Sequence, residues 1–464
     1  MYIHAPTAGT AQENATGALL FAGGRNLFSA GVFLIVFLYF WIGLDPLPDS
    51  TLLDPTKAYG GNSNRFNQIF VLGMVGLVLF TVFGKTSRNL LFQPWALLFL
   101  VFGWLFFAAF VAPDPGTAFR RTVFTLIVCI CANAVLLLPK SRDQFIALVA
   151  IALVLMLGLA YLTVTVLPHV GIHQASDPLE AQLAGDWRAH FGHKNAAAAA
   201  MVFAFFYGLY IGKVRSVLVG GGIALLALVF LWKSGSKTST AMLPAILLLA
   251  WLMERLQGGR LLLLIGSLLT VNAILLSAVH SKTVQSILVS AGIDPTFTNR
   301  TSIWQLAFYA ISESPLTGYG LQSFWQTDAL FRSSASLYTW AVTAANSHNA
   351  YVELLINGGV PAFVLVFIWL VILPVRYSRQ ALATSNDQSL TRLFLRIWLF
   401  SLFFACLESA FFVNAGPIWF TMLIGVFGLR LQAKDILVVS SSPLSETLVV
   451  QSQFPEKSVS ANPR

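Results

Sequence analysis

Charged side chains are scarce in this sequence. Asp, Glu, Lys and Arg make up 10% of its 464 residues, whereas 57% are hydrophobic. Soluble domains contain roughly 25% charged and 45–50% apolar residues. The composition therefore excludes an ordinary soluble protein and predicts an all-α polytopic membrane protein, with no nucleic-acid partner expected.

Cysteine is also scarce, and inspection of the sequence finds no internal repeat. The sequence holds 3 cysteines, Cys129, Cys131 and Cys406, and each lies in an apolar segment expected to be helical. Neither a disulfide framework nor a thiolate metal site is therefore indicated. The lack of an internal repeat disfavours transporter folds that are built from duplicated halves.

The sequence also shows no cleavable signal peptide. A polar tail, residues 1–26, precedes the first apolar run, which ends at Asp45 without a small-residue cleavage pattern. We expect that run to be retained as a helix and residues 1–26 to be a cytoplasmic N-terminal tail. Residues 435–464 are rich in Ser and carry no helical period, so they are predicted to be a disordered cytoplasmic C-terminal tail.

About twelve apolar segments are long enough to cross a hydrocarbon core of roughly 30 Å. They begin near Leu27, Ile69, Leu91, Thr122, Phe145, Asn195, Val217, Thr240, Leu261, Tyr351, Leu393 and Pro417. The range 27–434 is therefore predicted to be one transmembrane domain. Residues 280–350 would form a long loop between its ninth and tenth helices.

Basic residues predict the orientation, because short loops that keep Lys and Arg stay in the cytoplasm. Such residues fall in alternate loops: Lys85 and Arg88, Lys140 and Arg142, Lys213 and Arg215, Arg255 and Arg260, and Arg376, Arg379 and Arg392. This pattern places those loops in the cytoplasm. It places the 280–350 loop on the periplasmic side.

Several basic residues oppose this pattern by lying on the outer side. They are Lys57, Arg65, Arg120, Arg121, Arg188, Lys194, Lys233, Lys237, Lys282, Arg300 and Arg332. Any one of them alone is more often a solvated surface or headgroup contact. As a group they predict a cationic surface that faces an anionic substrate at the membrane boundary.

Two short outer segments lead directly into predicted helices. In the first, residues 186–195, His193, Lys194 and Asn195 sit at a helix N-terminus, where free N–H groups favour an anion. In the second, residues 233–240, glycine and hydroxyl residues around Lys237 would let backbone amides approach a phosphate. The second segment lacks Walker spacing, and a plain polar hairpin is an equal alternative.

The long loop contains a predicted helix and a turn. Arg300, Trp304, Phe308 and Ile311 recur at helical spacing, and Ser314-Pro315 would end the helix. Such a helix is expected to rest in the membrane interface, with its aromatic residues toward lipid and Arg300 near a phosphate. Further on, Gly318 and Gly320 flank Tyr319 and predict a tight turn.

His348 opens the next membrane helix in this prediction. Asn346 or Ser347 would cap that helix, which places His348 in its first turn. The positive end of the helix dipole would keep the imidazole neutral, the form that can accept a proton. A lone loop histidine is more often an ordinary surface residue, so His348 is a candidate base only with its neighbours.

A metal site is disfavoured, and no cofactor is expected. His190 with His193, and His169 with His173, form loose pairs. No nearby carboxylate cluster completes a ligand set, since Asp186 and Glu180 are badly spaced.

The sequence resembles the O-antigen ligase and polymerase superfamily in the order and spacing of its outer motifs. The motifs are RTSIW at 300–304, SPLTGYG at 314–320 and HNAY at 348–351. Further motifs resemble the ExoQ-like exopolysaccharide polymerase branch: FGHKN at 191–195, SKTS at 236–239 and the pair Glu408-Ser409. Val352 stands where the family motif often continues with leucine.

The resemblance implies a glycosyltransferase of the bacterial inner membrane, with a GT-C-like helical fold and an active site facing the periplasm. Its donor would be a glycan on undecaprenyl pyrophosphate and its acceptor a sugar hydroxyl. Membrane lipids, a chain-length regulator and export proteins are candidate partners. The family's base falls on His348, its pyrophosphate-binding arginine on Arg300, and a second basic position more loosely on Arg188.

Further site residues are predicted around these positions. Lys194 and Lys237 are candidates for the pyrophosphate, and the supporting residues are Trp304, Gly318, Gly320, Asn349, His193, Asn195 and Glu408. Glu408, the main charge predicted inside a helix, could be a buried structural group or an acceptor contact, and the structural role is favoured.

The predicted chemistry needs no metal, because guanidinium groups can neutralise a departing pyrophosphate, and the planar fork of Arg binds two oxygens at once. His348 would deprotonate the attacking hydroxyl during direct displacement with inversion. One alternative is a ligase that transfers the glycan to lipid A core. Another is a transporter of lipid-linked oligosaccharide, although that class should place charges inside its helices, and here nearly all lie in loops.

Overall fold

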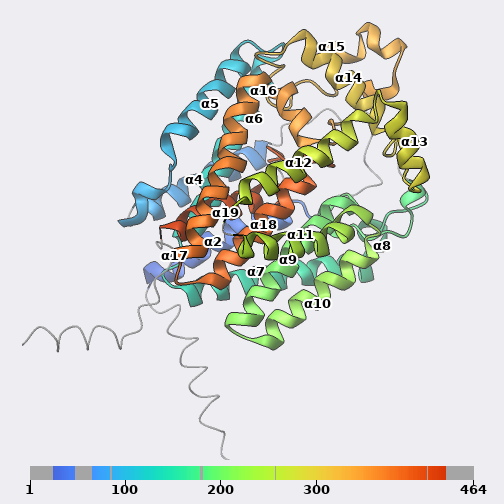
Figure 1. The fold of residues 1–464 in the computed structure, drawn as a ribbon. Coiled ribbons are helices and arrows are strands. Elements are labelled where there is room, and N and C mark those ends of the chain that lie inside the picture. The colour runs from blue at the N-terminus through green and yellow to red at the C-terminus, as the bar shows by residue number, and fades with distance from the viewer. Residues whose placement is uncertain are drawn as a thin grey trace, which may run out of the picture.

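The computed structural model describes residues 24–47, 65–83, 86–177, 181–256, 258–414 and 416–434. The predicted C-terminal tail and residues 1–23 of the N-terminal tail lie outside the described residues, as do Lys57 and Glu180. Across the described ranges the fold is helical, with one isolated antiparallel bridge between Ile172 and Trp187 (Figure 1).

Each predicted apolar segment falls on a helix. The helices are α2 (Gly24–Ile42), α4 (Arg65–Phe83), α5 (Trp95–Phe110), α6 (Pro115–Leu137), α7 (Arg142–Val166), α9 (Lys194–Val214), α10 (Val217–Lys233), α11 (Lys237–Arg255), α12 (Arg260–Ser277), α16 (Ala350–Phe367), α17 (Leu373–Thr384), α18 (Gln388–Phe404) and α19 (Pro417–Ala433). A π-helical turn, Ile368–Ile372, joins α16 to α17.

The chain is a multi-pass membrane protein. In the described ranges 6 segments are long and apolar enough to span a membrane: α4, α6, α7, α9, α12 and the continuous run from α16 to α17. Shorter apolar helices coincide with α2, α5, α10 and α19. These shorter helices are too short to cross a full hydrocarbon core without help from flanking residues. The total of about twelve spans therefore stays a prediction.

Side-chain caps explain where several helices begin. Ser141, Ser216 and Asp387 each accept a hydrogen bond from the backbone N–H three residues later, at the starts of α7, α10 and α18. These small oxygen-bearing side chains satisfy N–H groups that a helix start otherwise leaves unpaired.

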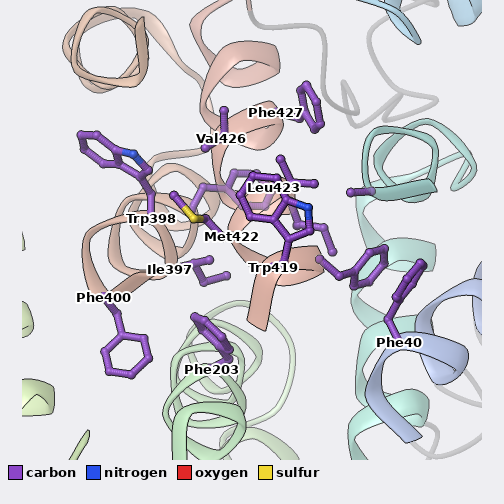
Figure 2. Close-up of a cluster of buried hydrophobic side chains, with 14 of the residues drawn as sticks. Phe40, Phe203, Ile397, Trp398, Phe400, Trp419, Met422, Leu423, Val426 and Phe427 are labelled. Carbon is purple, nitrogen blue, oxygen red and sulfur yellow. The ribbon is translucent and has the colours of Figure 1, made fainter. Parts of the chain in front are cut away.

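Large aromatic side chains pack the centre of the bundle. Figure 2 shows Phe40 from α2, Phe203 from α9, Trp398 from α18 and Trp419 from α19 converging on one cluster. Each of these side chains is 0–1% exposed. Tight packing of this kind holds membrane helices together, since lipid is as apolar as the core. It fixes α9 beside α18, so the start of α9 and the end of α18 lie at the same end of the bundle.

The segment between α12 and α16 is largely helical. It contains α13 (Lys282–Ser290), α14 (Arg300–Glu313), α15 (Asp328–Phe331) and two short turns, Ser334–Leu337 and Trp340–Thr343. Figure 1 shows α13, α14 and α15 in yellow and orange, at the upper right of the bundle. This segment has its own hydrophobic cluster, in which Ile303 and Phe324 pack with Ile356 of α16.

A tight turn at Gly318 and Gly320 ties this segment to α16, which confirms the predicted turn. Both residues have positive φ, +61° and +83°. The N–H of Tyr319 between them donates to the carbonyl of Ile356 at 2.8 Å. A Cβ at Gly318 would lie 2.3 Å from that same carbonyl oxygen. Both the backbone conformation and the close approach therefore require glycine.

Replacing Gly318 by alanine should lower the free energy of unfolding by about 2–3 kcal/mol, because a strained backbone and a clash add together. Thermal unfolding of the purified protein in detergent measures the loss. Gly292→Ala is the matched control, since Gly292 also has positive φ, +73°, but no atom within 4 Å of an added Cβ. An equal loss of stability in the two variants would show that the close contact between Gly318 and α16 does not contribute to the effect.

Candidate active site

Glu408 joins three segments that are far apart in the sequence. Its Oε1 accepts hydrogen bonds from Arg300 Nη2 at 2.8 Å and from Asn195 Nδ2 at 2.9 Å. Its Oε2 lies 3.0 Å from His348 Nδ1. Arg300 also donates from Nη1 to the carbonyl oxygen of Leu407. The predicted base and the predicted pyrophosphate-binding arginine therefore share one carboxylate.

Glu408 does not lie inside a helix, so that prediction is wrong. α18 ends at Phe404, and both Cys406 and Glu408 lie in the connection to α19, so the expectation that Cys406 is helical is wrong as well. The Glu408 side chain is 17% exposed. Its hydrogen bonds place it at the centre of the candidate site, and its role there stays a prediction.

The carboxyl of Glu408 is held in its ionised form. Burial pushes its pKa upward, but the hydrogen bond to His348 and the positive charge of Arg300 outweigh burial and lower the pKa to about 2. An ionised carboxylate can only accept hydrogen bonds. His348 Nδ1 must therefore carry the hydrogen of this bond, and Nε2 is the ring nitrogen that remains for another partner.

This lowered pKa predicts a pH dependence of stability. A carboxyl with a depressed folded-state pKa stabilises the fold above its ordinary value of 4.5, and this contribution is lost as pH falls toward about 2. The thermal stability of the wild type should therefore exceed that of Glu408→Gln at pH 6, and the difference should shrink below pH ~4.5. Glu313→Gln, at an exposed position at the end of α14, is the control. A difference between wild type and Glu408→Gln that stays constant down to pH ~2 would contradict the assignment.

His348 lies before α16 rather than in its first turn, so the predicted cap is wrong. α16 begins at Ala350, and its cap is Asn349, whose Oδ1 accepts from the N–H of Tyr351 and of Val352. His348 has a φ of +50°, and its N–H donates to Asn346 Oδ1 at 2.9 Å. The hydrogen bond to Glu408, not the helix dipole, therefore sets the environment of the ring.

Asn349 fixes the backbone beside His348. Its Nδ2 donates to the carbonyl of Cys406 and to Asn272 Oδ1, each at 2.9 Å. The N–H of Ala350 donates to the carbonyl of Ala405 at 2.8 Å. These bonds hold the start of α16 against the connection that carries Glu408.

Trp304 faces the protein, which corrects the expectation that the aromatic residues of this helix face lipid. The helix itself, α14, begins at Arg300 and ends at Glu313, just before Ser314-Pro315, as predicted. Trp304 is 0% exposed, and its Nε1 donates to the carbonyl of Ser347 at 2.9 Å. α14 therefore packs inward and supports the residue before His348.

The two short outer segments, residues 186–195 and 233–240, reach the site through Asn195. His193 caps α9 by accepting from the N–H of Asn195 at 3.1 Å. Ser236, at the start of α11, donates to Asn195 Oδ1 at 3.2 Å. Lys237 follows it, is exposed and forms no ion pair with the described residues. The structure thus brings Asn195 and Ser236 to Glu408.

Arg188 and Lys194 are already paired with carboxylates. Lys194 Nζ lies 2.6 Å from Asp186 Oδ2. Arg188 Nη1 lies 3.0 Å from Asp177 Oδ2, and its Nε donates to the carbonyl of Val170 at 2.9 Å. The hydrogen bonds of Arg188 within the described residues join it to the segment before α9, and none reaches Arg300, His348 or Glu408.

One histidine from each of the two loose pairs, His173 and His193, takes part in hydrogen bonding at the start of α9. The rings of His173 and His193 lie 5.5 Å apart, and His173 Nε2 accepts from the N–H of Lys194 at 3.2 Å. Among the residues that the structure describes, no group of three or more His, Cys, Asp and Glu side chains could hold a metal ion.

A cavity of about 1050 Å³ opens beside this cluster. Asn346 and Ser409 form part of its wall, and each is a near neighbour of His348 or Glu408. Its other walls carry aromatic and cationic side chains, among them Tyr309, Trp325 and Arg121. The volume is at the upper end of the roughly 300–1,000 Å³ typical of ligand sites.

Glu353 is a site residue that sequence reasoning missed. It is 4% exposed and accepts from the N–H of Ser347 at 2.8 Å and from Trp325 Nε1 at 3.0 Å. The signal was present, because a carboxyl in the first turn of an apolar membrane helix needs partners to be buried there. Glu353 and Trp304 thus bind the N–H and the carbonyl of Ser347, the residue before His348.

Comparisons with known proteins point to one family. A family model described as O-antigen ligase matches residues 199–367, a range that includes Arg300 and His348 and ends before Glu408. A curated relative, the exopolysaccharide production protein ExoQ of Rhizobium meliloti (strain 1021), is 26% identical over 322 residues, which cover 67% of this chain and 71% of that protein. Both findings confirm the resemblance seen in the motifs: this chain is similar to the O-antigen ligase and polymerase family and to its ExoQ-like branch.

Proposed function

We propose that this protein polymerises exopolysaccharide or O-antigen repeat units. It would transfer a glycan from undecaprenyl pyrophosphate to a sugar hydroxyl, without a metal ion. The single observation that carries the proposal is the shared carboxylate of Glu408, which lies within 3.0 Å of both the imidazole of His348 and the guanidinium of Arg300. A base and an anion-binding group held this close together fit the transfer of a sugar from a pyrophosphate.

His348 would act as the general base. With Nδ1–H donated to Glu408, its Nε2 takes the proton of the acceptor hydroxyl as that oxygen bonds to the anomeric carbon. The bond between the anomeric carbon and the phosphate oxygen breaks, and its electron pair leaves with undecaprenyl pyrophosphate. Attack opposite the leaving group inverts the anomeric centre. Glu408 is a positioning residue here, because it orients the ring and stabilises the imidazolium that forms.

Arg300 would bind the leaving pyrophosphate. A guanidinium has five N–H donors. Two of the groups of Arg300, Nη1 and Nη2, already bond to Leu407 and Glu408, which fixes the plane of the fork and leaves Nε–H and further hydrogens for phosphate oxygens. Lys237, exposed at the start of α11, would add a second positive charge. Arg188 and Lys194, already paired, would act by holding the start of α9 in place.

The large cavity would receive the glycan. Aromatic rings such as Tyr309, Phe324 and Trp325 offer flat apolar faces, and Gln322 and Asn346 offer amide groups that can bond to sugar hydroxyls. The wall at Asn346 and Ser409 would bring one end of the glycan to His348. We place this site on the periplasmic side of the bacterial inner membrane, where a chain-length regulator and export proteins would be partners.

Reconstitution with a defined lipid-linked repeat unit tests the proposal. Purified protein in liposomes should convert the donor into a ladder of longer glycans that remain on undecaprenyl pyrophosphate, measured by mass spectrometry. A conjugate formed only when lipid A core is added would identify a ligase instead. Movement of the donor across the bilayer without new glycosidic bonds would identify a transporter and overturn the proposal.

A further inference from the structure

A second, smaller pocket lies at the other end of the bundle from His348. It has a volume of about 220 Å³ and is lined by the last turns of α9 and α11 and the first turns of α18. α9 is 21 residues long, so at about 1.5 Å per residue its two ends are about 30 Å apart. The pocket is therefore one hydrocarbon thickness away from Asn195 and Glu408, on the side that the basic loops predict to be cytoplasmic.

The pocket carries an excess of positive charge. Lys213, Arg392 and Arg396 line it together with a single carboxylate, Glu254. Glu254 Oε2 accepts from Arg392 Nε at 2.9 Å, so the carboxylate is already paired. The nearby carboxylate of Asp387 pairs outside the pocket, at 2.8 Å from Arg142 Nε. Lys213 and Arg396 form no ion pair with a carboxylate among the described residues, and the charge of Glu254, which also acts on Arg396, is shared with Arg392.

Arg396 is the most informative of these groups. Its Nε is buried and has no hydrogen-bond partner among the described residues. Leaving a buried N–H of a charged group without an acceptor costs free energy. Such an N–H therefore usually bonds to a ligand or to a partner group. An anion seated between Lys213 and Arg396 would supply it.

The rest of the pocket favours a lipid over a soluble anion. Leu209, Leu247 and Trp251 form apolar parts of its wall. Trp251 is 50% exposed and the adjacent Leu248 is 58% exposed, which in a membrane protein means exposure to lipid. Tryptophan at this depth is typical of the membrane interface. The phosphate of a lipid would therefore contact the cations of the pocket, and its acyl chain would contact the apolar wall.

We propose that this pocket binds the phosphate headgroup of an anionic phospholipid in the cytoplasmic leaflet. Lys213 and Arg396 contact the phosphate, and an acyl chain lies along Trp251 and Leu248. Basic pockets between membrane helices are known to select anionic headgroups in this way. The inference does not depend on the polymerase assignment, because none of these residues belongs to the His348 site.

Lipid retention measured by native mass spectrometry tests it. The full-length protein, incorporated into nanodiscs of equal parts phosphatidylglycerol and phosphatidylcholine, should retain phosphatidylglycerol about tenfold over phosphatidylcholine. Arg396→Gln and Lys213→Gln should each lower that ratio about fivefold, since one basic residue near the headgroup is lost. Lys213 is exposed, so its variant should fold even where Arg396→Gln does not.

Arg376→Gln is the matched control, because Arg376 is an exposed basic residue on the same predicted side and does not line the pocket. It should leave the ratio unchanged. An equal loss in Arg376→Gln would show that only overall charge matters and would overturn the proposal. Binding of inorganic phosphate without any preference for phosphatidylglycerol would assign the pocket to a soluble anion. That result would also overturn the proposal.

Discussion

His348→Ala should yield a folded, membrane-inserted protein that makes no detectable polymer. The ring lies at the edge of the site, with 33% of its side chain exposed, so its removal leaves the packed core intact. Loss of a general base typically costs about 10²- to 10⁴-fold in rate. The measurement is the initial rate of glycan extension by purified protein in liposomes, compared with wild type at equal amounts of folded protein.

His280→Ala is the control for His348→Ala. His280 is an exposed histidine at the start of the same segment, and its ring lies 6.4 Å from that of Phe308. Its variant should extend glycans at the wild-type rate. Wild-type polymer from His348→Ala would remove this imidazole from the mechanism. Loss of activity in both variants would instead point to a disturbed loop.

Local features of the site were predictable from the sequence because they depend on neighbours in the chain. The bounds of α14 follow from the spacing of its apolar residues and from Pro315, which cannot continue a helix. The turn at Gly318 follows from the need for positive φ. Both were predicted correctly from nearby residues alone.

The links that make the site were not predictable in the same way. Glu408 is 108 positions from Arg300 and 60 positions from His348, and no pattern in one sequence records such distances. Trp304 shows why periodicity is also insufficient. Helical spacing identifies one face of α14, but lipid and a protein core are equally apolar, so spacing cannot tell which of them the face contacts.

Two further features of the site depend on residues that are close in the sequence: charge partners and competing caps. Arg188 and Lys194 pair with carboxylates that lie only 11 and 8 positions away, so these ion pairs are local in the sequence. At the start of α16, Asn346 and Ser347 compete with Asn349, and each can act as a cap. Asn349 is the cap in the structure, because its side chain accepts hydrogen bonds from two N–H groups of α16.

Arg300→Lys should lower the rate of polymer formation about 10- to 100-fold, because a charged hydrogen bond contributes roughly 1.5–3 kcal/mol. The guanidinium of Arg300 bonds to Leu407 and Glu408 with two different nitrogens and still has hydrogens for phosphate. An ammonium is a single point that cannot reproduce this fork. The loss should appear as weaker binding of the donor, measured as a raised KM for the lipid-linked glycan.

The split between KM and kcat distinguishes phosphate binding from an indirect effect on His348. If Arg300 only oriented Glu408, the variant would disturb the base and lower kcat while the donor KM stayed constant. Arg332→Lys is the control, since Arg332 is 83% exposed on the same segment and lies 3.5 Å from Asp328. Near-wild-type turnover by Arg300→Lys would mean that charge alone suffices, and the planar fork would then have no part in holding the pyrophosphate.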